Sequence, residues 1–214
     1  MPRPYGINEK NEESLSYFQG EVYNYPLPDF MLQDHMIISS AKLLRSFHEV
    51  SGMYIDKITN QEKWMLPVID PIEVMCHGDF APYNVTIVDG EAFGIIDFDT
   101  LHPGPKMWDI AYAVYRWVPF TNPTNPDCCF SLNEQIRKAK LFLDTYGVKF
   151  DERELLPQMM TDRLTSLISY MKNQAKNGNE DFQKNIEEGH MDLYINDVQY
   201  IGKNERMIID GVSK

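Results

Sequence analysis

The feature that most constrains the fold is an Asp89-Gly90 pair between two short apolar runs, residues 85–88 and residues 92–96. An Asp-Gly pair between such runs is a strong signal of a tight β-hairpin, because a type I′ turn needs a positive φ at both central residues. The sequence therefore predicts a two-stranded antiparallel unit near the middle of the chain.

The register of this hairpin brings polar side chains together. Counted outward from the turn, Val88 faces Glu91 and Asn84 falls opposite Ile95. Asn84 and Asp97 are therefore expected to emerge side by side at the open end of the hairpin.

A second carboxylate lies close to this point in the sequence. Asp79 comes five residues before Asn84, on the loop that leads into the first strand. Two carboxylates and an amide that converge on one spot call for a cation between them, and oxygen ligands of this kind suit Mg²⁺ bridged to phosphate. We expect Asp79, Asn84 and Asp97 to converge there.

The rest of the chain is a little β-structure followed mostly by helix, which predicts an α+β fold. A polar tip between apolar residues predicts a hairpin over 5–18, and Val74-Met75-Cys76 predicts a short buried strand. Apolar periodicity, Pro119 and Tyr146-Gly147 predict helices from Asp34 onward and over 108–118, 132–145, 152–176 and 180–200.

Composition excludes several classes of protein. The chain of 214 residues is 43% hydrophobic and has no apolar run able to cross a bilayer and no signal segment, so we expect no membrane partner. Three cysteines, two of them adjacent, do not make a disulfide framework and favour a cytoplasmic location. A net charge of −12 without a basic stripe argues against nucleic acid. The acidity either attracts a cationic substrate or only keeps the protein soluble.

Four linked motifs resemble those of one enzyme family. They are His77-Gly78-Asp79-x4-Asn84, Ile95-Ile96-Asp97-Phe98, the stretch 99–105 and Trp108-Asp109-Ile110-Ala111. In order and spacing they resemble the catalytic core of the aminoglycoside phosphotransferase and choline kinase family, and they parallel the catalytic loop and metal-binding Asp of protein kinases. The resemblance implies the C-terminal lobe of a protein-kinase-like fold, mostly helical with catalytic β-hairpins.

The resemblance also implies a function and its residues. The activity would be phosphoryl transfer from ATP or GTP to a hydroxyl group of a small molecule. Asp79 would be the catalytic base, and Asn84 and Asp97 would hold Mg²⁺ on the phosphates of the nucleotide. A metal-dependent phosphohydrolase shares the Asp and metal chemistry but does not account for the motif at 108–111.

Other residues receive supporting roles from the same resemblance. Tyr17, Phe18 and Gln19 form a hinge-like segment that, with Ile96, would contact the nucleotide. His77 and Asp109 would be structural: His77 would hold the catalytic loop, and Asp109, which opens a helix, would hydrogen-bond the backbone of that loop.

The sequence departs from the family before the hinge. No Gly-rich loop precedes residue 17, and Arg3 and Lys10 are the upstream cations. We therefore expect residues 1–30 to be a remnant of the N-terminal lobe plus the hinge, and residues 31–214 to be the C-terminal lobe. Three alternatives follow: the sequence is a truncated fragment, the lobe comes from another polypeptide, or the protein is a catalytically impaired, kinase-like binding protein.

Several single residues carry no role that the sequence decides. Asp99 either assists a metal or faces solvent, and His102 could meet substrate on the loop after Asp97. His48 is expected to pack at the end of its helix, and Cys76 to be a small buried hydrophobe. Carboxylates of the helical tail such as Glu187, Glu188 and Asp192 are expected to hold the substrate.

The N-terminal hairpin suggests an oligomer. Residues 5–18 would expose unpaired strand edges if their neighbouring strands are absent, and such edges recruit partners. We expect a homodimer through this hairpin, since twofold dimers are the most common soluble oligomers; the alternative is a monomer whose hairpin folds back on its own helical lobe.

Overall fold

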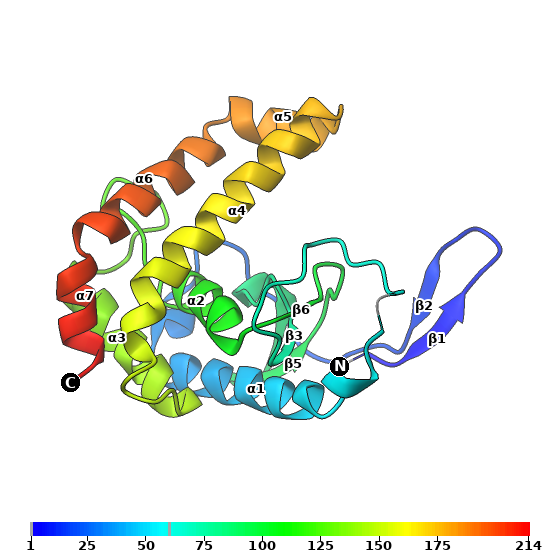
Figure 1. Cartoon of the computed structure of the whole chain (residues 1–214), viewed down its shortest axis with the longest axis horizontal. Helices are drawn as coiled ribbons and strands as arrows, with labels where there is room; N and C mark the ends of the chain where they lie inside the picture. The colour runs from blue at the N-terminus through cyan, green and yellow to red at the C-terminus, as the bar shows by residue number, and fades with distance from the viewer. Residues whose placement is uncertain (1, 60) are drawn as a thin grey trace.

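The computed structural model describes residues 2–59 and 61–214, and these form an α+β fold in which helices predominate (Figure 1). Within them, three two-stranded antiparallel sheets pair β1 with β2, β3 with β6 and β4 with β5. The two sheets in the middle of the chain lie against the helices, and the N-terminal sheet projects from the rest of the molecule. The expected fold class is confirmed.

The predicted hairpin around Asp89-Gly90 is present as β4 (Val85–Val88) and β5 (Glu91–Ile95). Asp89 has φ 51° and Gly90 has φ 77°, the positive angles that a type I′ turn requires.

Its register differs by one residue from the predicted one. Val88 pairs with Glu91 as expected, but a bulge between Thr86 and Ile87 places Val85 opposite Ile95. The expectation that Asn84 faces Ile95 is therefore wrong, because a β-bulge adds an unpaired residue and shifts every partner beyond it.

The strand β3 (Val74–Cys76) pairs with β6 (His102–Gly104), which the sequence did not predict. Cys76 lies opposite His102, so the chain leaving β3 and the chain entering β6 run beside each other. The catalytic-loop motif starts directly after β3 and thus sits at one end of this small sheet.

The helices are α1 (Asp34–Gly52), α2 (Lys106–Trp117), α3 (Leu132–Tyr146), α4 (Leu156–Lys176), α5 (Glu180–Glu187), α6 (His190–Lys203) and α7 (Glu205–Val212). Short 3₁₀ turns lie at Asp29–Leu32, Ile55–Lys57, Pro82–Asn84 and Arg153–Leu155.

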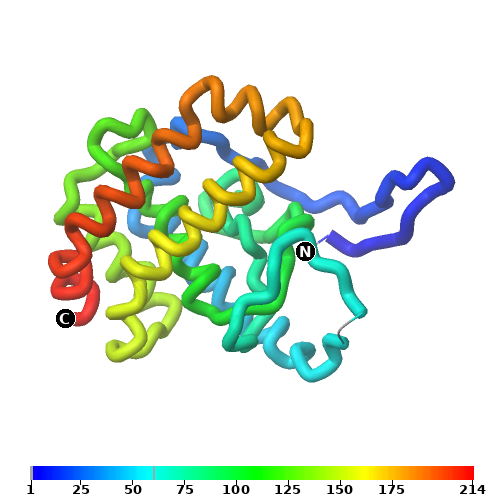
Figure 2. Tube along the Cα trace, turned by 45° about the horizontal axis from the view of Figure 1, so that its top comes forward, coloured from blue at the N-terminus to red at the C-terminus, as the bar shows by residue number. Residues whose placement is uncertain are grey.

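The helix α1 packs on α3 and β5, and α4 packs on both α2 and α6. The tube in Figure 2 shows α4 and α6 running beside each other, joined through α5. Among the described residues, none of the helices combines the length and the apolar character needed to cross a membrane.

The C-terminal helices are more broken than the sequence predicted. Asn179 caps α5 by accepting hydrogen bonds from the backbone N–H groups of Asp181 and Phe182, as predicted for a helix start near 180. Gly189 then adopts φ 85° and ends the helix, so the single helix expected over 180–200 is instead α5 and α6. A Gly in this left-handed conformation breaks a helix that its apolar pattern alone would continue.

The core is built around α2. Its side chains are buried over almost its whole length, including Trp117 and Tyr115, and Phe80, Phe142 and Leu164 from other elements are fully buried beside them. Trp108 and Tyr112 are buried as well. The aromatic residues of this helix therefore form the interior that supports the loops next to it.

The N-terminal hairpin consists of β1 (Pro4–Ile7) and β2 (Glu13–Leu15), all of whose residues are exposed. Its connection to the helical part runs along β4 and β5. Glu21 and Ile87 exchange backbone hydrogen bonds of 3.1 and 2.8 Å. The ring of Phe18 lies directly on Gly94, where an added Cβ would come 1.7 Å from the ring.

Candidate active site

The loop that follows β3 is held in an unusual backbone conformation. Gly78 has φ 82°, and a Cβ there would lie 2.5 Å from the carbonyl oxygen of Thr100. Only glycine tolerates both the angle and the contact. The His77-Gly78-Asp79 motif is therefore a sharp turn packed tightly against the segment before β6.

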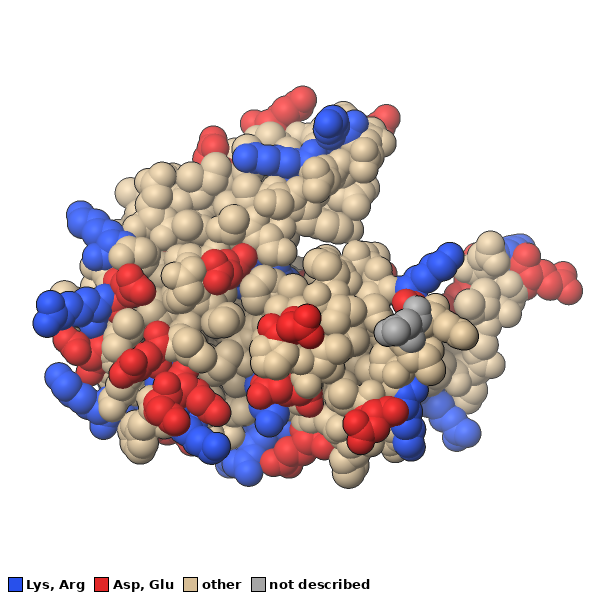
Figure 3. Space-filling view, viewed as in Figure 1, with Lys and Arg blue, Asp and Glu red and all other residues tan. Residues whose placement is uncertain are grey.

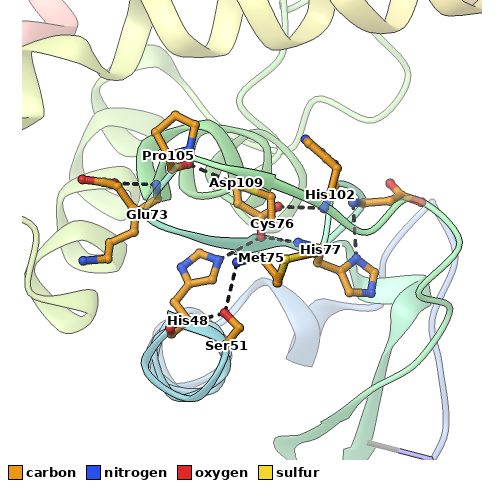
Figure 4. A network of polar contacts seen from close by, with 12 residues as sticks. His48, Ser51, Glu73, Met75, Cys76, His77, His102, Pro105 and Asp109 are labelled. Atoms are coloured by element: carbon orange, nitrogen blue, oxygen red, sulfur yellow. Dashed lines mark hydrogen bonds and ion pairs between the residues drawn. The ribbon is translucent and has the colours of Figure 1, made fainter. Parts of the chain in front are cut away.

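A buried carboxylate on α2 fixes the backbone of this turn. Asp109 on α2 is fully buried and accepts hydrogen bonds from the backbone N–H groups of His77, at 2.8 Å, and Gly78, at 3.0 Å. His48 of α1 adds a contact at 3.0 Å through Nε2, and its Nδ1 lies 2.8 Å from the hydroxyl of Tyr146. Figure 4 shows His48 reaching up from α1 to Asp109, which lies beside His77.

Opposing effects act on the ionisation of Asp109. Burial alone would raise its pKa, but the hydrogen bond and charge of His48 and the donors at His77 outweigh it and lower the pKa of Asp109 to about 2. Asp109 is thus a carboxylate at neutral pH, and it holds the backbone N–H groups of His77 and Gly78.

The candidate base Asp79 is partly buried and held by two donors. The hydroxyl of Tyr83 donates to Oδ1 at 2.8 Å, and the amide Nδ2 of Asn84 donates to Oδ2 at 2.8 Å. The same amide group reaches the backbone oxygen of Asp79 at 3.0 Å. These contacts fix the position of the carboxylate relative to the start of β4.

The pKa of Asp79 is raised above its ordinary value, chiefly because burial disfavours the charged form. Hydrogen bonds from Tyr83 and Tyr112 and the charges of Arg163 and Arg116 act in the opposite direction and limit the increase. A carboxylate with a raised pKa is a better proton acceptor than an exposed one, which suits a general base.

The predicted metal ligands lie on neighbouring segments. The backbone N–H of Ile96 donates to the carbonyl oxygen of Asn84 at 3.0 Å, so Asp97 follows directly after a residue bonded to Asn84. Asn84 is buried, and its amide nitrogen donates to Asp79, so the side-chain oxygen is the atom that a metal ion would meet. Asp97 is exposed and has φ 58°, a strained angle for a residue other than glycine.

The donor chemistry of these two side chains fits Mg²⁺. Hard oxygen ligands from one amide and one carboxylate, completed by phosphate oxygens, are typical of magnesium held on a nucleotide. No group of three or more His, Cys, Asp or Glu side chains among residues 2–59 and 61–214 is arranged to hold a metal ion. Asn84 and Asp97 remain the predicted ligands.

The histidines near the loop are structural. His77 is buried, its Nε2 lies 2.9 Å from the carbonyl oxygen of Ile96, and its Nδ1 accepts the backbone N–H of Asp79. His102 is buried and its Nδ1 lies 2.8 Å from the carbonyl oxygen of Thr100, and it is not among the residues that line the cavity beside Asp79. Asp99 is exposed to solvent.

The hinge-like segment lies along the outer side of β5. Phe18 packs on Gly94 and stacks with Phe93 at 5.6 Å between ring centroids, whereas Tyr17 and Gln19 are exposed. Their role in nucleotide binding stays a prediction, as does that of the partly buried Ile96.

Asp79 forms part of the wall of a cavity of about 230 Å³. The cavity lies between α4, α5 and α6 on one side and the catalytic loop on the other, and Figure 3 shows a hollow between the arm made by α4 and α5 and the body of the molecule. Its lining residues are Leu66, Asp79, Tyr83, Thr100, Tyr112, Arg163, Ser166, Leu167, Tyr170, Phe182 and Tyr194.

Sequence reasoning missed most of this wall. It proposed the carboxylates Glu187, Glu188 and Asp192 as substrate ligands, but none of them lines the cavity, where five of the eleven lining residues are aromatic. Arg163 is the residue from which the sequence could have indicated this cavity. It stands at helical spacing among the buried Met160, Leu164 and Ile168 of α4, where a charged residue is unusual.

Comparisons with known proteins agree with this geometry. Residues 55–127 match the sequence profile of the family described as APH, the phosphotransferase enzyme family. That segment contains Asp79, Asn84 and Asp97 as well as the supporting residues His77 and Asp109. The resemblance to the APH phosphotransferase family is confirmed.

Solved structures share the fold of this chain over a larger part of its length. An ethanolamine kinase from Plasmodium vivax superposes with a TM-score of 0.61 at 13% identity, over 94% of this chain and 66% of the other. The structure of APH(2″)-IIa in a ternary complex with streptomycin and ATP gives 0.50 at 13% identity, over 85% and 71% of the two chains. This chain thus spans about two thirds of the length of the first of these structures. No curated protein sequence matches it.

Proposed function

We propose that this protein transfers the γ-phosphoryl group of ATP or GTP to a hydroxyl group of a small molecule. The observation that carries the proposal is the position of Asp79. Its carboxylate is fixed by Tyr83 and Asn84, has a raised pKa, and forms the wall of a cavity large enough for a small acceptor. The match of residues 55–127 to a phosphotransferase family supports it.

In the proposed reaction the acceptor lies in the cavity with its hydroxyl group beside Asp79. The hydroxyl oxygen attacks the γ-phosphorus, a new P–O bond forms, and the bond between the γ-phosphorus and the β,γ-bridging oxygen breaks. The electron pair of that bond leaves with the nucleoside diphosphate, and the hydroxyl proton passes to Asp79. Asp79 then releases the proton to solvent.

The other residues orient this step. Tyr83 and Asn84 hold the two oxygens of Asp79, and Asp109 holds the loop on which Asp79 stands. Bound Mg²⁺ would neutralise charge on the phosphates, and Asn84 and Asp97 are the residues that would hold it.

The first test is calorimetric titration with ATP and with GTP, each with and without Mg²⁺. We expect weak binding that depends on Mg²⁺, because the proposed contacts with the nucleotide are the hinge segment and the two metal ligands. The substitution Asp97→Ala should remove the metal-dependent part. Tight binding without Mg²⁺ would contradict the proposed site.

The second test measures nucleoside diphosphate release with a panel of hydroxylated acceptors. The substitution Asp79→Ala should leave nucleotide binding nearly intact and abolish turnover. Nucleotide binding with no phosphoryl transfer to any acceptor would favour the alternative, a kinase-like binding protein.

A further inference from the structure

Arg163 is a buried cation whose hydrogen bonds are incomplete. It lies on α4, its side chain is 5% exposed, and one terminal nitrogen donates to the carbonyl oxygen of Gly78. The guanidinium lies 4.3 Å from the ring centroid of Tyr112. Within the described residues, its Nε meets no acceptor and no carboxylate forms an ion pair with it. A buried N–H without an acceptor is costly, and an oxygen of a bound ligand is one partner that would satisfy it. Of the buried side chains with such a group, Arg163 is the one that lines the cavity beside Asp79 among the described residues.

The position of Arg163 shows which ligand it would meet. Arg163 and Asp79 line the same cavity, but Asn84 and Asp97, the predicted metal ligands, do not. The cavity therefore lies on the acceptor side of Asp79, away from the predicted site of the nucleotide phosphates.

The charge of the cavity wall is unlike that of the whole protein. The net charge is −12, but Asp79 is the one carboxylate among the described lining residues, and Arg163 balances it. Asp79 is committed to the reacting hydroxyl group in the proposed mechanism. An ammonium group in the cavity would find no further carboxylate and would face the like charge of Arg163 at short range, where little solvent screens it.

We propose that the acceptor of this enzyme carries an anionic oxygen group, a carboxylate or a phosphate ester, which binds to Arg163 while the hydroxyl group lies at Asp79. This inference rests on the proposed function and names the chemical class of its substrate. The aromatic side chains of Tyr170, Phe182 and Tyr194 enclose the carbon skeleton between the two ends.

Four three-carbon probes that differ in one group test the proposal by calorimetry. They are glycerate, glycerol 3-phosphate, glycerol and 3-amino-1,2-propanediol. We expect one or both anionic probes to bind at least about tenfold more tightly than the other two, since only they can accept a charge-assisted hydrogen bond from Arg163 with an anionic oxygen. Comparison of glycerate with glycerol 3-phosphate distinguishes a carboxylate site from a phosphate site.

Substitutions test whether Arg163 causes the preference for the anionic probes. The substitution Arg163→Gln should abolish the preference for the anionic probes, and Arg163→Lys should restore part of it because the charge returns without the planar donor set. Arg153→Gln is the matched control. Arg153 is also a buried arginine, but it donates to the carbonyl oxygens of Val148 and Val212 and does not line the cavity.

Asp79→Asn separates this inference from the proposed function. The variant should lose phosphoryl transfer and still bind the anionic probe. If an anionic probe binds to the wild type and to Asp79→Asn but is never phosphorylated, the proposed function fails and the anion site stands. Equal binding of all four probes, tighter binding of the amine, no binding of any probe, or a preference that survives Arg163→Gln would each overturn the anion site.

Discussion

At the scale of single residues, the ionisation of Asp79 is set by a balance that mutation can shift. Burial raises its pKa, and the hydroxyl of Tyr83, donating at 2.8 Å, stabilises the charged form and lowers it. A general base works only when deprotonated, so the rate should fall on the acid side as pH drops through the raised pKa of Asp79.

Tyr83→Phe should therefore move the acid limb of the profile of kcat/KM against pH toward higher pH, because a donor to the carboxylate is lost. Tyr170→Phe is the control, since Tyr170 lines the same cavity but forms no hydrogen bond with Asp79 among the described contacts. An acid limb that stays in place in Tyr83→Phe would show that Asp79 is not the group that titrates.

For Asp109 the prediction concerns the free energy of unfolding. Asp109→Asn puts an amide donor among three donors, those of His77, Gly78 and His48, and leaves at least one of them without an acceptor. We expect a loss of about 2–4 kcal/mol in the free energy of unfolding at pH 7, measured with urea. The exposed Asp99→Asn on a nearby loop should change it by less than about 0.5 kcal/mol.

The same variant gives a pH dependence of known sign. The pKa of Asp109 is about 2 in the folded protein, below the value of about 3.9 for an unfolded chain. A depressed pKa stabilises the folded state fully above the unfolded value, and this contribution is lost as pH falls toward the folded value. The difference between wild type and Asp109→Asn should thus be constant above about pH 5 and shrink between about pH 4 and 2. A constant difference throughout would contradict the carboxylate's role.

At the scale of secondary-structure elements, local chemistry decided what the sequence could predict. The Asp89-Gly90 turn was predictable because the positive φ of both residues is a local property. The bulge was not, because nothing in the side chain of Phe93, the residue of β5 left unpaired between Ala92 and Gly94, distinguishes a bulged strand from a regular one, and the error shifted Asn84 by one position.

The motif at 77–97 could be predicted from the sequence and the cavity could not, for the same reason. Asp79, Asn84 and Asp97 lie within one short stretch of sequence, so the hydrogen bonds from Asn84 to Asp79 and from Ile96, the neighbour of Asp97, to Asn84 follow from one hairpin and the loop before it. Arg163 and Phe182 reach the same place only through the packing of α4 on α2 and the turn into α5. Contacts of that range depend on tertiary structure, which periodicity does not specify.

The contact between Phe18 and Gly94 joins the hinge segment to β5 and is testable as a pair. Gly94→Ala should destabilise the protein by about 1–3 kcal/mol, because a Cβ there would overlap the ring of Phe18. In the double variant with Phe18→Ala that clash is gone, so the cost of Gly94→Ala should largely disappear. Urea unfolding of the four proteins measures this coupling, and additive effects would place Phe18 away from Gly94.

At the scale of the whole molecule, the β1–β2 hairpin stands apart from the helical body (Figures 1 and 2). Its exposed side chains include Tyr5, Ile7 and Leu15, and Tyr17 follows it. A two-stranded hairpin is marginal in water and exposes free strand edges, so we propose that two copies of the chain pair through it.

Light scattering over a range of concentrations should then give a dimer mass, and Ile7→Lys combined with Tyr17→Lys should shift the protein to monomer. Phe150→Lys, an exposed aromatic residue remote from the hairpin in sequence, is the control and should leave the mass unchanged. A monomer mass for the wild type up to high micromolar concentration, with residues 5–18 resistant to protease, would exclude the dimer.

The edge-on pair of Tyr170 and Phe182, whose rings lie 5.6 Å apart across α4 and α5, has a consequence for how the protein could be re-engineered. Both side chains line the cavity, whereas the loop that carries Asp79 is held from α2 by Asp109, which His48 of α1 contacts. Randomising these two aromatic positions therefore samples new cavity shapes while leaving the anchor of Asp79 in place. A combinatorial library restricted to them should keep a high share of folded members, and selection could then alter which hydroxylated compound is accepted.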